Sequence, residues 1–343
     1  MTRTKEDVTT GPQLIDGDLV VSFRAMATTV NVRIVEPKPR RGPKQAARVT
    51  QMFADVERAC TRFNPDSPLM KANAAPRDWH VVPQECFDAI REAARAYAET
   101  AGRFDPRVLK RLQQIGYDRT LAFAEGNVEV STPTEAATSW RPFGGRPATS
   151  AAAMRDPWSP KFDARRRAVK IGPEPIDLGG IGKGLAVRLA AELLTGSGGS
   201  FLVEAGGDCY LAGQGPEGDG WRVAVEDPAE GPDPVAVLNV SDVACATSSV
   251  RIRSWIVDGK PVHHLIDPRT GEPGGAGLAA VTVVGPDPAW AEVWSKSLFL
   301  ASRTGIRALA EEHGLAALWV TPQGRVGTSE AMKPYVMWQA VDD

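Results

Sequence analysis

The amino-acid sequence predicts an α+β fold in which mixed and antiparallel sheets pack against helices within a single large domain. Short apolar runs separated by turns outnumber the helical patterns, and the two do not alternate regularly as they would in a doubly wound α/β protein. The 33 glycines and 27 prolines among the 343 residues indicate many turns. No internal repeat is visible, so a repeat architecture is not expected.

The N-terminal third is predicted to hold a hairpin followed by helices. Residues 1–16 are polar and are expected to form a flexible tail, which leaves residues 17–343 for the domain. After this tail, two strands joined by a tight AMATT turn are expected, because the segment TTVNVRIV alternates apolar and polar residues. Apolar side chains at helical spacing then predict helices over residues 45–63 and about 84–101. A short helix is expected after the turn at Asp105-Pro106.

The rest of the chain is predicted to begin with a loop and to end in strands. Residues 125–166 are rich in Ser, Thr, Pro, Gly and Ala and are expected to form a long irregular surface loop. A helical pattern starts at Lys183. Short strands and two helices are expected to follow it, the strands at 200–205, 221–227, 235–240, 278–285, 316–321 and 335–341, and the helices at 289–302 and 304–313.

Composition and charge exclude several classes of protein. The formal net charge is -2, which disfavours a protein that binds nucleic acid or an anionic membrane. No apolar stretch is long enough for a membrane span. The four cysteines are scattered without a CxxC pair, so buried reduced thiols are expected instead of a zinc site or disulfides. With no signal-peptide pattern, these features predict a cytoplasmic protein.

A glycine-rich turn, PIDLGGIGKGLAVRLAAELLTG at residues 175–196, is typical of a phosphate site, since it leads into a helix. It does not match the two common nucleotide motifs. A Walker A loop needs Ser or Thr after its lysine, but Gly184 follows Lys183 here. A dinucleotide fingerprint needs a third glycine where Leu185 stands, so a nicotinamide-dependent oxidoreductase is not favoured.

The whole phrase IDLGGIGKGLA instead resembles the DLG-x-x-x-KG motif of the ApbE family, the FAD:protein FMN transferases. Further segments resemble that family in the same order along the chain, from about residue 20 to residue 335. They are MATTV (26–30), TRFNPDSPLMKAN (61–73), GRFDPRVL (102–109), EAGGDCYLAG (204–213), ATSSV (246–250), HHLIDPRTGEP (263–273) and WAEVWSKSLFL (290–300).

This resemblance implies an ApbE-like fold and an enzyme that cleaves FAD. FMN would be attached through a phosphoester to a Thr or Ser of an acceptor flavoprotein, and AMP would be released. The chain shows no convincing acceptor motif of its own, so the acceptor would be another protein. Two alternatives stay open: a diverged protein that binds FAD without transfer, with Lys296 in place of the metal, and an FAD pyrophosphatase that yields FMN and AMP.

The resemblance also implies particular site residues. His264 is the candidate base for the acceptor hydroxyl, since an imidazole titrates near neutral pH. Lys183 and Asp177 complete the candidate catalytic set. The candidate FAD-binding residues are Met26, Phe63, Arg103, Phe104, Asp105, Asp177, Lys183, Thr247, Ser248, Leu265, Ile266 and Asp267. Ordinary core packing for Met26 and Phe63, and ordinary turns for Asp105 and Thr247, remain open alternatives.

The Mg²⁺ site that the resemblance implies is altered in this chain. The matching positions are the Gly180 carbonyl and, on one helix, Glu292, Ser295 and Lys296. An ammonium group has no lone pair and cannot ligate a metal ion. Two outcomes are open: Lys296 turns away and Mg²⁺ is still bound, or its ammonium, paired with Glu292 at i,i+4, fills the place of the ion. Arg107 in FDPR and Ser249 in TSS are further departures from the family pattern.

Overall fold

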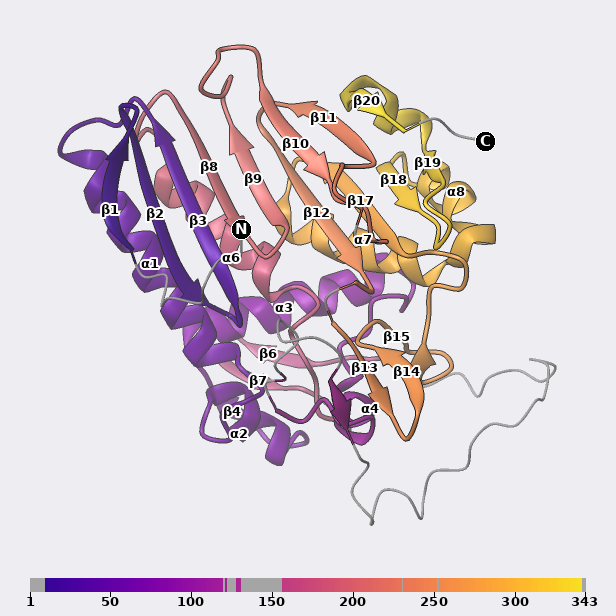
Figure 1. Ribbon diagram of the computed structural model, residues 1–343. Helices are drawn as coiled ribbons and strands as arrows, with labels where there is room; N and C mark the ends of the chain where they lie inside the picture. The colour runs from indigo at the N-terminus through magenta and orange to yellow at the C-terminus, as the bar shows by residue number, and fades with distance from the viewer. Residues whose placement is uncertain are drawn as a thin grey trace.

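The largest sheet of the computed structural model is antiparallel throughout (Figure 1). The structure describes residues 10–119, 121, 128–130, 156–229, 231–251 and 253–340. Among these, nine strands hydrogen-bond in the order β1-β2-β3-β8-β9-β12-β17-β18-β19. Their bounds are β1 Thr10–Ile15, β2 Asp18–Ala25, β3 Thr28–Val35, β8 Ser200–Ala205, β9 Asp208–Ala212, β12 Val243–Ser249, β17 Ala280–Gly285, β18 Ala316–Val320 and β19 Val326–Thr328.

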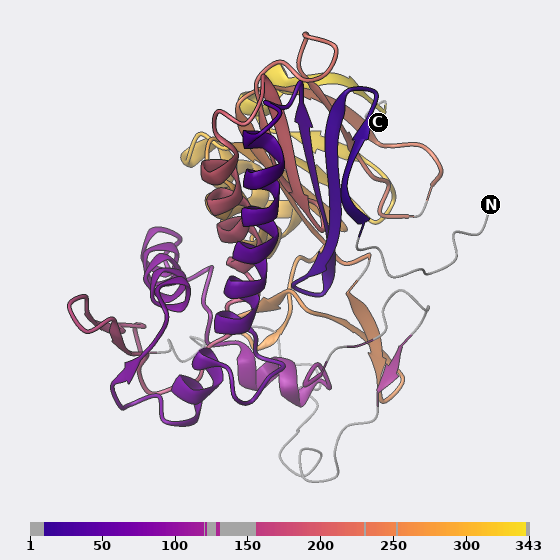
Figure 2. The same cartoon turned by 90° about the vertical axis from the view of Figure 1, so that its left-hand side faces the viewer.

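Helices cover one face of this sheet, as the side view shows for α1 and α6 (Figure 2). The four helices of this layer are α1 Arg41–Cys60, α6 Gly182–Leu194, α7 Pro288–Leu300 and α8 Ser302–Glu312. A small sheet packs on the opposite face and consists of β10 Trp221–Val225, β11 Ala236–Val240 and β20 Val336–Gln339. Strand β18 is buried between the two layers: Trp319 packs with the helices, whereas Leu318 packs with the small sheet.

Smaller elements lie at one end of the main sheet, below it in Figure 1. The helices there are α2 Pro68–Ala74, α3 Gln84–Glu99 and α4 Leu109–Gln114. The short strands are β4 His80–Val81, β5 Glu129–Val130, β6 Lys161–Asp163, β7 Ala168–Lys170, β13 Ser254–Val257, β14 Lys260–His263, β15 Ile266–Asp267 and β16 Glu272–Pro273, and a 3₁₀ helix, η2, spans Glu330–Tyr335 near the C-terminus. A separate small core that includes Tyr117 and Trp255 joins α4 to β5 and β13.

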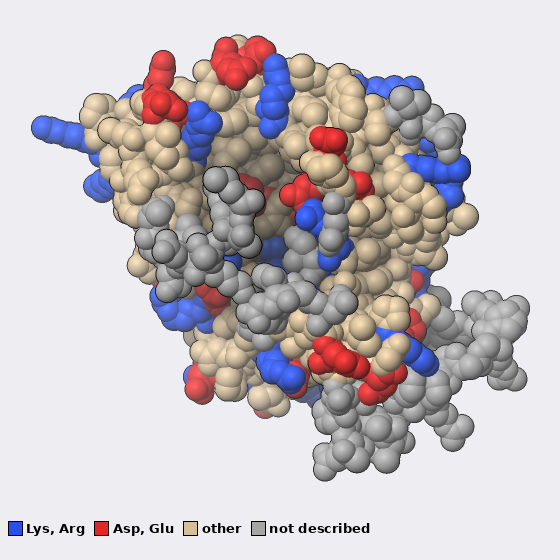
Figure 3. Space-filling model, in the orientation of Figure 1, with Lys and Arg blue, Asp and Glu red and all other residues tan. Residues whose placement is uncertain are grey.

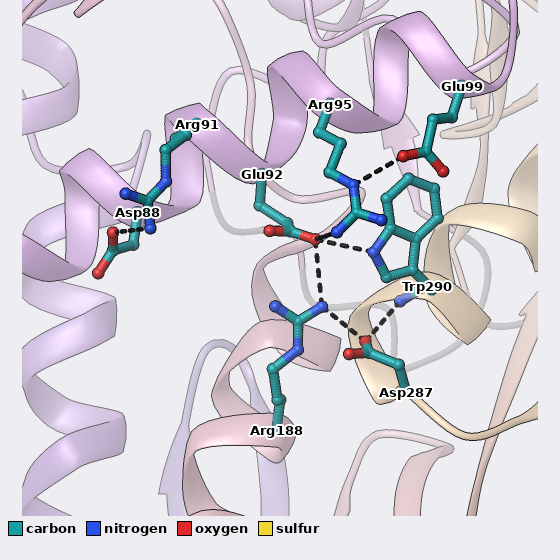
Figure 4. A network of polar contacts seen from close by, with 8 residues as sticks. All are labelled: Asp88, Arg91, Glu92, Arg95, Glu99, Arg188, Asp287 and Trp290. Atoms are coloured by element: carbon teal, nitrogen blue, oxygen red, sulfur yellow. Dashed lines mark hydrogen bonds and ion pairs between the residues drawn. The ribbon is translucent and has the colours of Figure 1, made fainter.

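Polar contacts fasten three helices to one another (Figure 4). Glu92 on α3 accepts hydrogen bonds from Arg188 on α6, at 3.2 Å, and from the Trp290 indole on α7, at 2.8 Å. Arg188 also donates to Asp287 at 2.6 Å, and Asp287 caps the first turn of α7 by accepting from the Trp290 amide. We call these four side chains the outer network. It holds α6 and α7 side by side.

The α+β fold with antiparallel sheets confirms the predicted class. The prediction of an N-terminal tail is wrong for Thr10–Ile15, because this segment pairs with β2 as the edge strand β1. Residues 1–9 of the predicted tail lie outside the described part of the chain. The expected loop at 125–166 is interrupted by β5 and β6, and its residues 131–155 are not described. Within the described chain, no helix is both long and apolar enough to cross a membrane.

Candidate functional site

A cavity of about 320 Å³ opens at the end of the main sheet, where α6 and α7 meet the small elements below. Its size lies within the range that is usual for small-molecule sites. Residues from widely separated segments form its wall: Met26, Ala27, Glu57, Cys60, Thr61, Arg62, Phe63, Arg103, Phe104, Asp105, Pro106, Val108, Leu112, Tyr117, Asp177, Leu178, Gly179, Gly180, Gly182, Lys183, Arg253, His264, Leu265, Ile266, Lys296 and Leu300.

The glycine-rich turn is held in this wall by two other segments of the chain. The buried side chain of Asn73 bonds to both backbone groups of Ile176, donating to its carbonyl and accepting from its amide, each at 2.8 Å. The Asp177 amide donates to the Pro106 carbonyl at 2.7 Å. The Asp177 carboxylate accepts from the Gly179 amide at 3.0 Å and so shapes the turn. Three of the segments singled out in the sequence therefore meet here.

Gly184 explains why the lysine of this turn is followed by glycine. A Cβ on Gly184 would lie 2.5 Å from the Pro288 carbonyl oxygen, at the start of α7. Only glycine allows the two helices to approach this closely. The Gly184 amide donates to Glu292 Oε2 at 2.8 Å, so a carboxylate from α7 satisfies a free amide in the first turn of α6.

Four charged side chains meet where α6, α7 and β9 come together, and we call them the inner cluster: Lys183, Asp208, Glu292 and Lys296. Lys183 Nζ donates to Asp208 and, at 2.9 Å, to Glu292 Oε1. Lys296 Nζ donates to the same Oε1 at 3.0 Å. The two carboxylates are enclosed, whereas the lysine side chains are 13% and 18% exposed and line the cavity. The inner cluster therefore presents its positive groups to the cavity.

The pKa values in the inner cluster follow from burial and from these pairs. Burial lowers the pKa of Lys183, but the Asp208 and Glu292 carboxylates outweigh it and raise that pKa to about 12. Burial raises the pKa of Glu292, but the two lysines outweigh it and lower that pKa to about 2. Burial raises the pKa of Asp208 to about 6 against the opposing effect of Lys183, and it lowers the pKa of Lys296 although Glu292 opposes the shift. Glu292 is thus the firmly ionised partner of both lysines.

His264 lines the cavity with its proton placed on one nitrogen. Nδ1 lies 3.2 Å from the Arg253 carbonyl oxygen. Because a carbonyl only accepts, Nδ1 carries the hydrogen and Nε2 keeps its lone pair. Burial, followed by the charges of Arg253 and Lys296, lowers the pKa of His264 well below its usual range. The imidazole is therefore neutral at neutral pH and has the form that a general base requires.

Aromatic rings line one part of the cavity, which we call the aromatic end. The Arg62 guanidinium lies over both the Phe63 ring and the Tyr117 ring, 4.2 Å from each ring centroid. Its Nε lies 3.8 Å from the Asp177 carboxylate, but its buried Nη2 has no hydrogen-bond partner among the described residues. Met26 reaches the cavity from the tight β2–β3 turn. This end of the cavity therefore offers flat apolar surface and one hydrogen-bond donor, Arg62 Nη2, that a ligand could use.

The structure brings most of the predicted site residues into the cavity wall. Twelve of them line it: Met26, Phe63, Arg103, Phe104, Asp105, Asp177, Gly180, Lys183, His264, Leu265, Ile266 and Lys296. Asp105 is also held by Arg107 in a buried ion pair of 2.7 Å. The arginine of FDPR therefore fixes this carboxylate.

Five predicted site residues do not line the cavity. Ser248 Oγ lies 2.8 Å from Ser295 Oγ and so points into the interface between β12 and α7. Thr247 Oγ1 lies 2.9 Å from Thr282 Oγ1 on the opposite face of the sheet, the face of Cys245. Asp267 accepts hydrogen bonds from Arg269, and Glu292 lies behind the two lysines. Residues 246–249 of the segment ATSSV form the end of strand β12, and Val250 follows the strand.

Four other residues of the site were not assigned from the sequence. Arg62 precedes Phe63 in a segment that the resemblance had marked, and Asp208 lies in the marked segment EAGGDCYLAG. Tyr117 and Arg253 belong to segments without a motif, and only the fold brings them to the cavity.

The residues expected to bind Mg²⁺ do not suit that ion. Glu292 Oε1 accepts from two ammonium groups and Oε2 from an amide, while the buried Ser295 hydroxyl is bonded to Ser248 and to the Glu292 carbonyl. The Lys296 side chain runs past Gly180, since a Cβ on Gly180 would lie 3.5 Å from Lys296 Cδ. In the described parts of the chain, no group of three or more His, Cys, Asp and Glu side chains could hold a metal ion. Magnesium needs oxygen ligands in octahedral geometry, and a cationic side chain stands among these donors.

The outer surface shows no large basic area on the face seen in Figure 3. Lys and Arg side chains are interspersed there with Asp and Glu side chains among the described residues. Recognition of a small anionic ligand would therefore depend on the cavity itself.

Comparisons with known proteins agree with this geometry. The model of the ApbE family matches residues 26–319. The FAD:protein FMN transferase of Klebsiella pneumoniae is 27% identical over 312 residues, which cover 89% of this chain and 85% of the relative. The FAD:protein FMN transferase of Treponema pallidum is 27% identical over 320 residues, covering 89% and 84%. The crystal structure of the ApbE protein from Thermotoga maritima superposes with a TM-score of 0.75 at 25% identity and covers 93% of this chain and 99% of its own. Since the family model matches well over half of its length, this chain belongs to the ApbE family.

Proposed function

We propose that the protein is an FAD:protein FMN transferase. It would cleave FAD and attach FMN through a phosphoester to a Thr or Ser of an acceptor flavoprotein. One observation carries this proposal: a single cavity joins an aromatic end, two lysine ammonium groups and a neutral histidine with a free Nε2. The relatives named above, which carry the same activity in their names, support it.

Each part of the cavity has a role in the proposed transfer. The flavin ring would lie at the aromatic end, and the pyrophosphate would lie beside Lys183 and Lys296, whose charge stabilises the negative charge that develops on its oxygens. Asp177 and Arg103 line the same cavity. His264 Nε2 would take the proton from the acceptor hydroxyl as its oxygen bonds to the FMN phosphorus. The bond from that phosphorus to the bridging oxygen breaks, and AMP leaves with this oxygen.

The acidity of His264 predicts the pH dependence of this step. Only the neutral imidazole accepts a proton, and its pKa is lowered well below 6.5. The rate should therefore stay constant as the pH falls to 6.5 and decrease only at lower pH, where His264 becomes protonated. A kcat/KM profile that is halved near pH 6.5 or above would contradict this role of His264.

The proposal is tested by incubating the protein with FAD and an acceptor that carries a Thr in a flavinylation motif, while AMP and covalent flavin fluorescence are followed. Transfer yields both signals. AMP without labelled acceptor would indicate the pyrophosphatase alternative, and bound FAD without AMP would indicate the binding-only alternative. His264→Asn should reduce transfer by about 100- to 10,000-fold. The neighbouring His263, which packs against Phe299 and does not line the cavity, provides the matched control His263→Asn.

The proposal also includes the kind of acceptor and the cellular location. The acceptor would be a separate flavoprotein, because this chain shows no convincing acceptor motif of its own. A cytoplasmic location stays a prediction from the sequence. The residues given for Mg²⁺ do not fit the ion, so no step of the proposed reaction passes through a metal.

A further inference from the structure

The side chain of Lys296 stands at one of the positions where a ligand of Mg²⁺ was expected. We propose that the ammonium group of Lys296 is the resident cation of the pyrophosphate site, so that FAD is bound and cleaved without a divalent metal ion. This inference rests on the proposed function and adds to it the identity of the cation that faces the phosphates.

The position of Lys296 is the first argument. Its side chain leaves α7 at the position expected for a metal ligand, runs past Gly180 and lines the cavity. Lys296 Nζ is held by Glu292 Oε1 at 3.0 Å, across one turn of the same helix. The ammonium is thus fixed by a buried carboxylate, while 18% of its side chain remains exposed. A phosphate oxygen that entered the cavity would meet the free hydrogens of this group.

The charge balance of the inner cluster is the second argument. Asp208 and Glu292 together carry two negative charges when ionised, and Lys183 supplies a single positive charge. Lys296 supplies the second, so the inner cluster is neutral before any ligand arrives. Arg253, which also lines the cavity, then adds positive potential for an anion. A divalent cation placed here would face two ammonium groups, and both carboxylates of the inner cluster are already paired with these groups.

The third argument is that the oxygen atoms of Ser295 and Glu292, the other side chains expected to bind Mg²⁺, are already hydrogen-bonded within the protein. Ser295 lies next to Lys296 in sequence, but its hydroxyl is fully buried and bonded to Ser248, away from the cavity. Glu292 uses both oxygens for protein donors. Removing Lys296 would free one of these acceptor positions and open the space beside Gly180. A hydroxyl at position 296 should therefore restore a site for Mg²⁺.

The test measures FAD affinity in EDTA and in excess Mg²⁺ for the full chain and three variants. We expect the unmodified protein to bind FAD equally under both conditions, within about twofold. Lys296→Thr should bind FAD about 10- to 100-fold more weakly in EDTA and should regain most of the affinity with Mg²⁺. Lys296→Met, which offers no oxygen, should stay weak in both. Lys333→Thr removes an exposed lysine paired with Glu330 and serves as the control with unchanged affinity.

A second readout needs no flavin. Mn²⁺ titrated into the protein and followed by electron paramagnetic resonance should show no bound ion at this site in the unmodified chain and one bound ion in Lys296→Thr. The inference is overturned if the unmodified protein loses FAD affinity in EDTA, or if Lys296→Thr binds FAD in EDTA as well as the unmodified protein does. FAD that fails to bind in both conditions would overturn the proposed function as well, whereas Mg²⁺-dependent binding overturns this inference alone.

Discussion

Two sets of charged side chains join α6 to α7, and they differ in what surrounds them. The inner cluster joins Lys183 on α6 to Glu292 on α7, and the Glu292 carboxylate is completely buried. The outer network joins Arg188 on α6 to Asp287 at the start of α7 (Figure 4). These two side chains are 21% and 33% exposed. Both sets hold the helices together, but only the inner cluster contributes to the cavity wall.

This difference separates a structural contact from a candidate functional one. In the outer network the charged side chains bind to other groups of the protein: Asp287 caps α7, and Glu92 accepts hydrogen bonds from both Arg188 and Trp290. In the inner cluster the carboxylates face inward, and the ammonium groups face the cavity with donors to spare. Mutations in the outer network should therefore lower stability alone, whereas those in the inner cluster should change stability and FAD binding together.

The largest effect is expected for Glu292→Gln. This change leaves two ammonium groups beside the single carboxylate of Asp208 and should lower the free energy of unfolding by about 3–5 kcal/mol. Chemical denaturation followed by tryptophan fluorescence would measure it. The FAD affinity should fall as well, because both lysines lose their fixed position. A loss below about 1 kcal/mol would mean that the inner cluster is no more tightly coupled than an exposed pair.

The same residue predicts a pH dependence of stability. The pKa of Glu292 is about 2 in the folded protein and 4.5 in the absence of interactions. Its stabilising contribution is therefore complete above pH 4.5 and is lost as the pH falls toward 2. The unmodified protein should lose stability over this window more steeply than Glu292→Gln. Denaturation midpoints of the two proteins at pH 5 and at lower pH would check this, and parallel curves would contradict it.

A smaller effect is expected for Asp287→Ala in the outer network. The change removes the cap of α7 and the 2.6 Å ion pair with Arg188, and it should cost about 1–2 kcal/mol. The FAD affinity should stay the same, because Asp287 does not line the cavity. Isothermal titration with FAD beside a thermal melt would show both. A parallel loss of FAD affinity would mean that the two sets are not independent.

The smallest effect is expected for Glu92→Gln. The amide oxygen can still accept from Arg188 and Trp290, so only the charge of the pair is lost, and the cost should be about 0.5 kcal/mol. The effect should shrink further in high salt, since the pair is partly exposed. A salt series of denaturation midpoints for the unmodified protein and the variant would detect this difference, and a cost that is independent of salt would contradict it.

The sequence predicted the parts of this site that lie within motifs. Periodicity predicted the β2–β3 hairpin and the helices, and the resemblance to the ApbE family singled out Met26, Lys183, His264 and Lys296, which line one cavity in the structure. The sequence did not predict which face of the sheet each side chain of the central strand β12 points to. Ser248 bonds to Ser295 because α7 packs directly on β12, and that contact depends on the register of the whole sheet.

Other residues could not be predicted because their role depends on long-range packing. Tyr117 and Arg253 belong to no sequence motif. Tyr117 packs in the small core around Trp255, and the Arg253 carbonyl lies beside His264, so the fold brings both residues to the cavity. The motif around Lys183 also does not reveal that Asp208 and Glu292 neutralise its charge. Since these carboxylates lie on different elements, their meeting follows from the close approach at Gly184.

The most direct test of the account is a crystal structure of the FAD complex grown with Mn²⁺, with anomalous scattering measured at the manganese edge. We predict that a phosphate oxygen of FAD lies within hydrogen-bond distance of Lys296 Nζ and that no anomalous peak lies between Gly180 and Glu292. A manganese ion bound there by Glu292 and Ser295, with Lys296 turned out of the cavity, would contradict it.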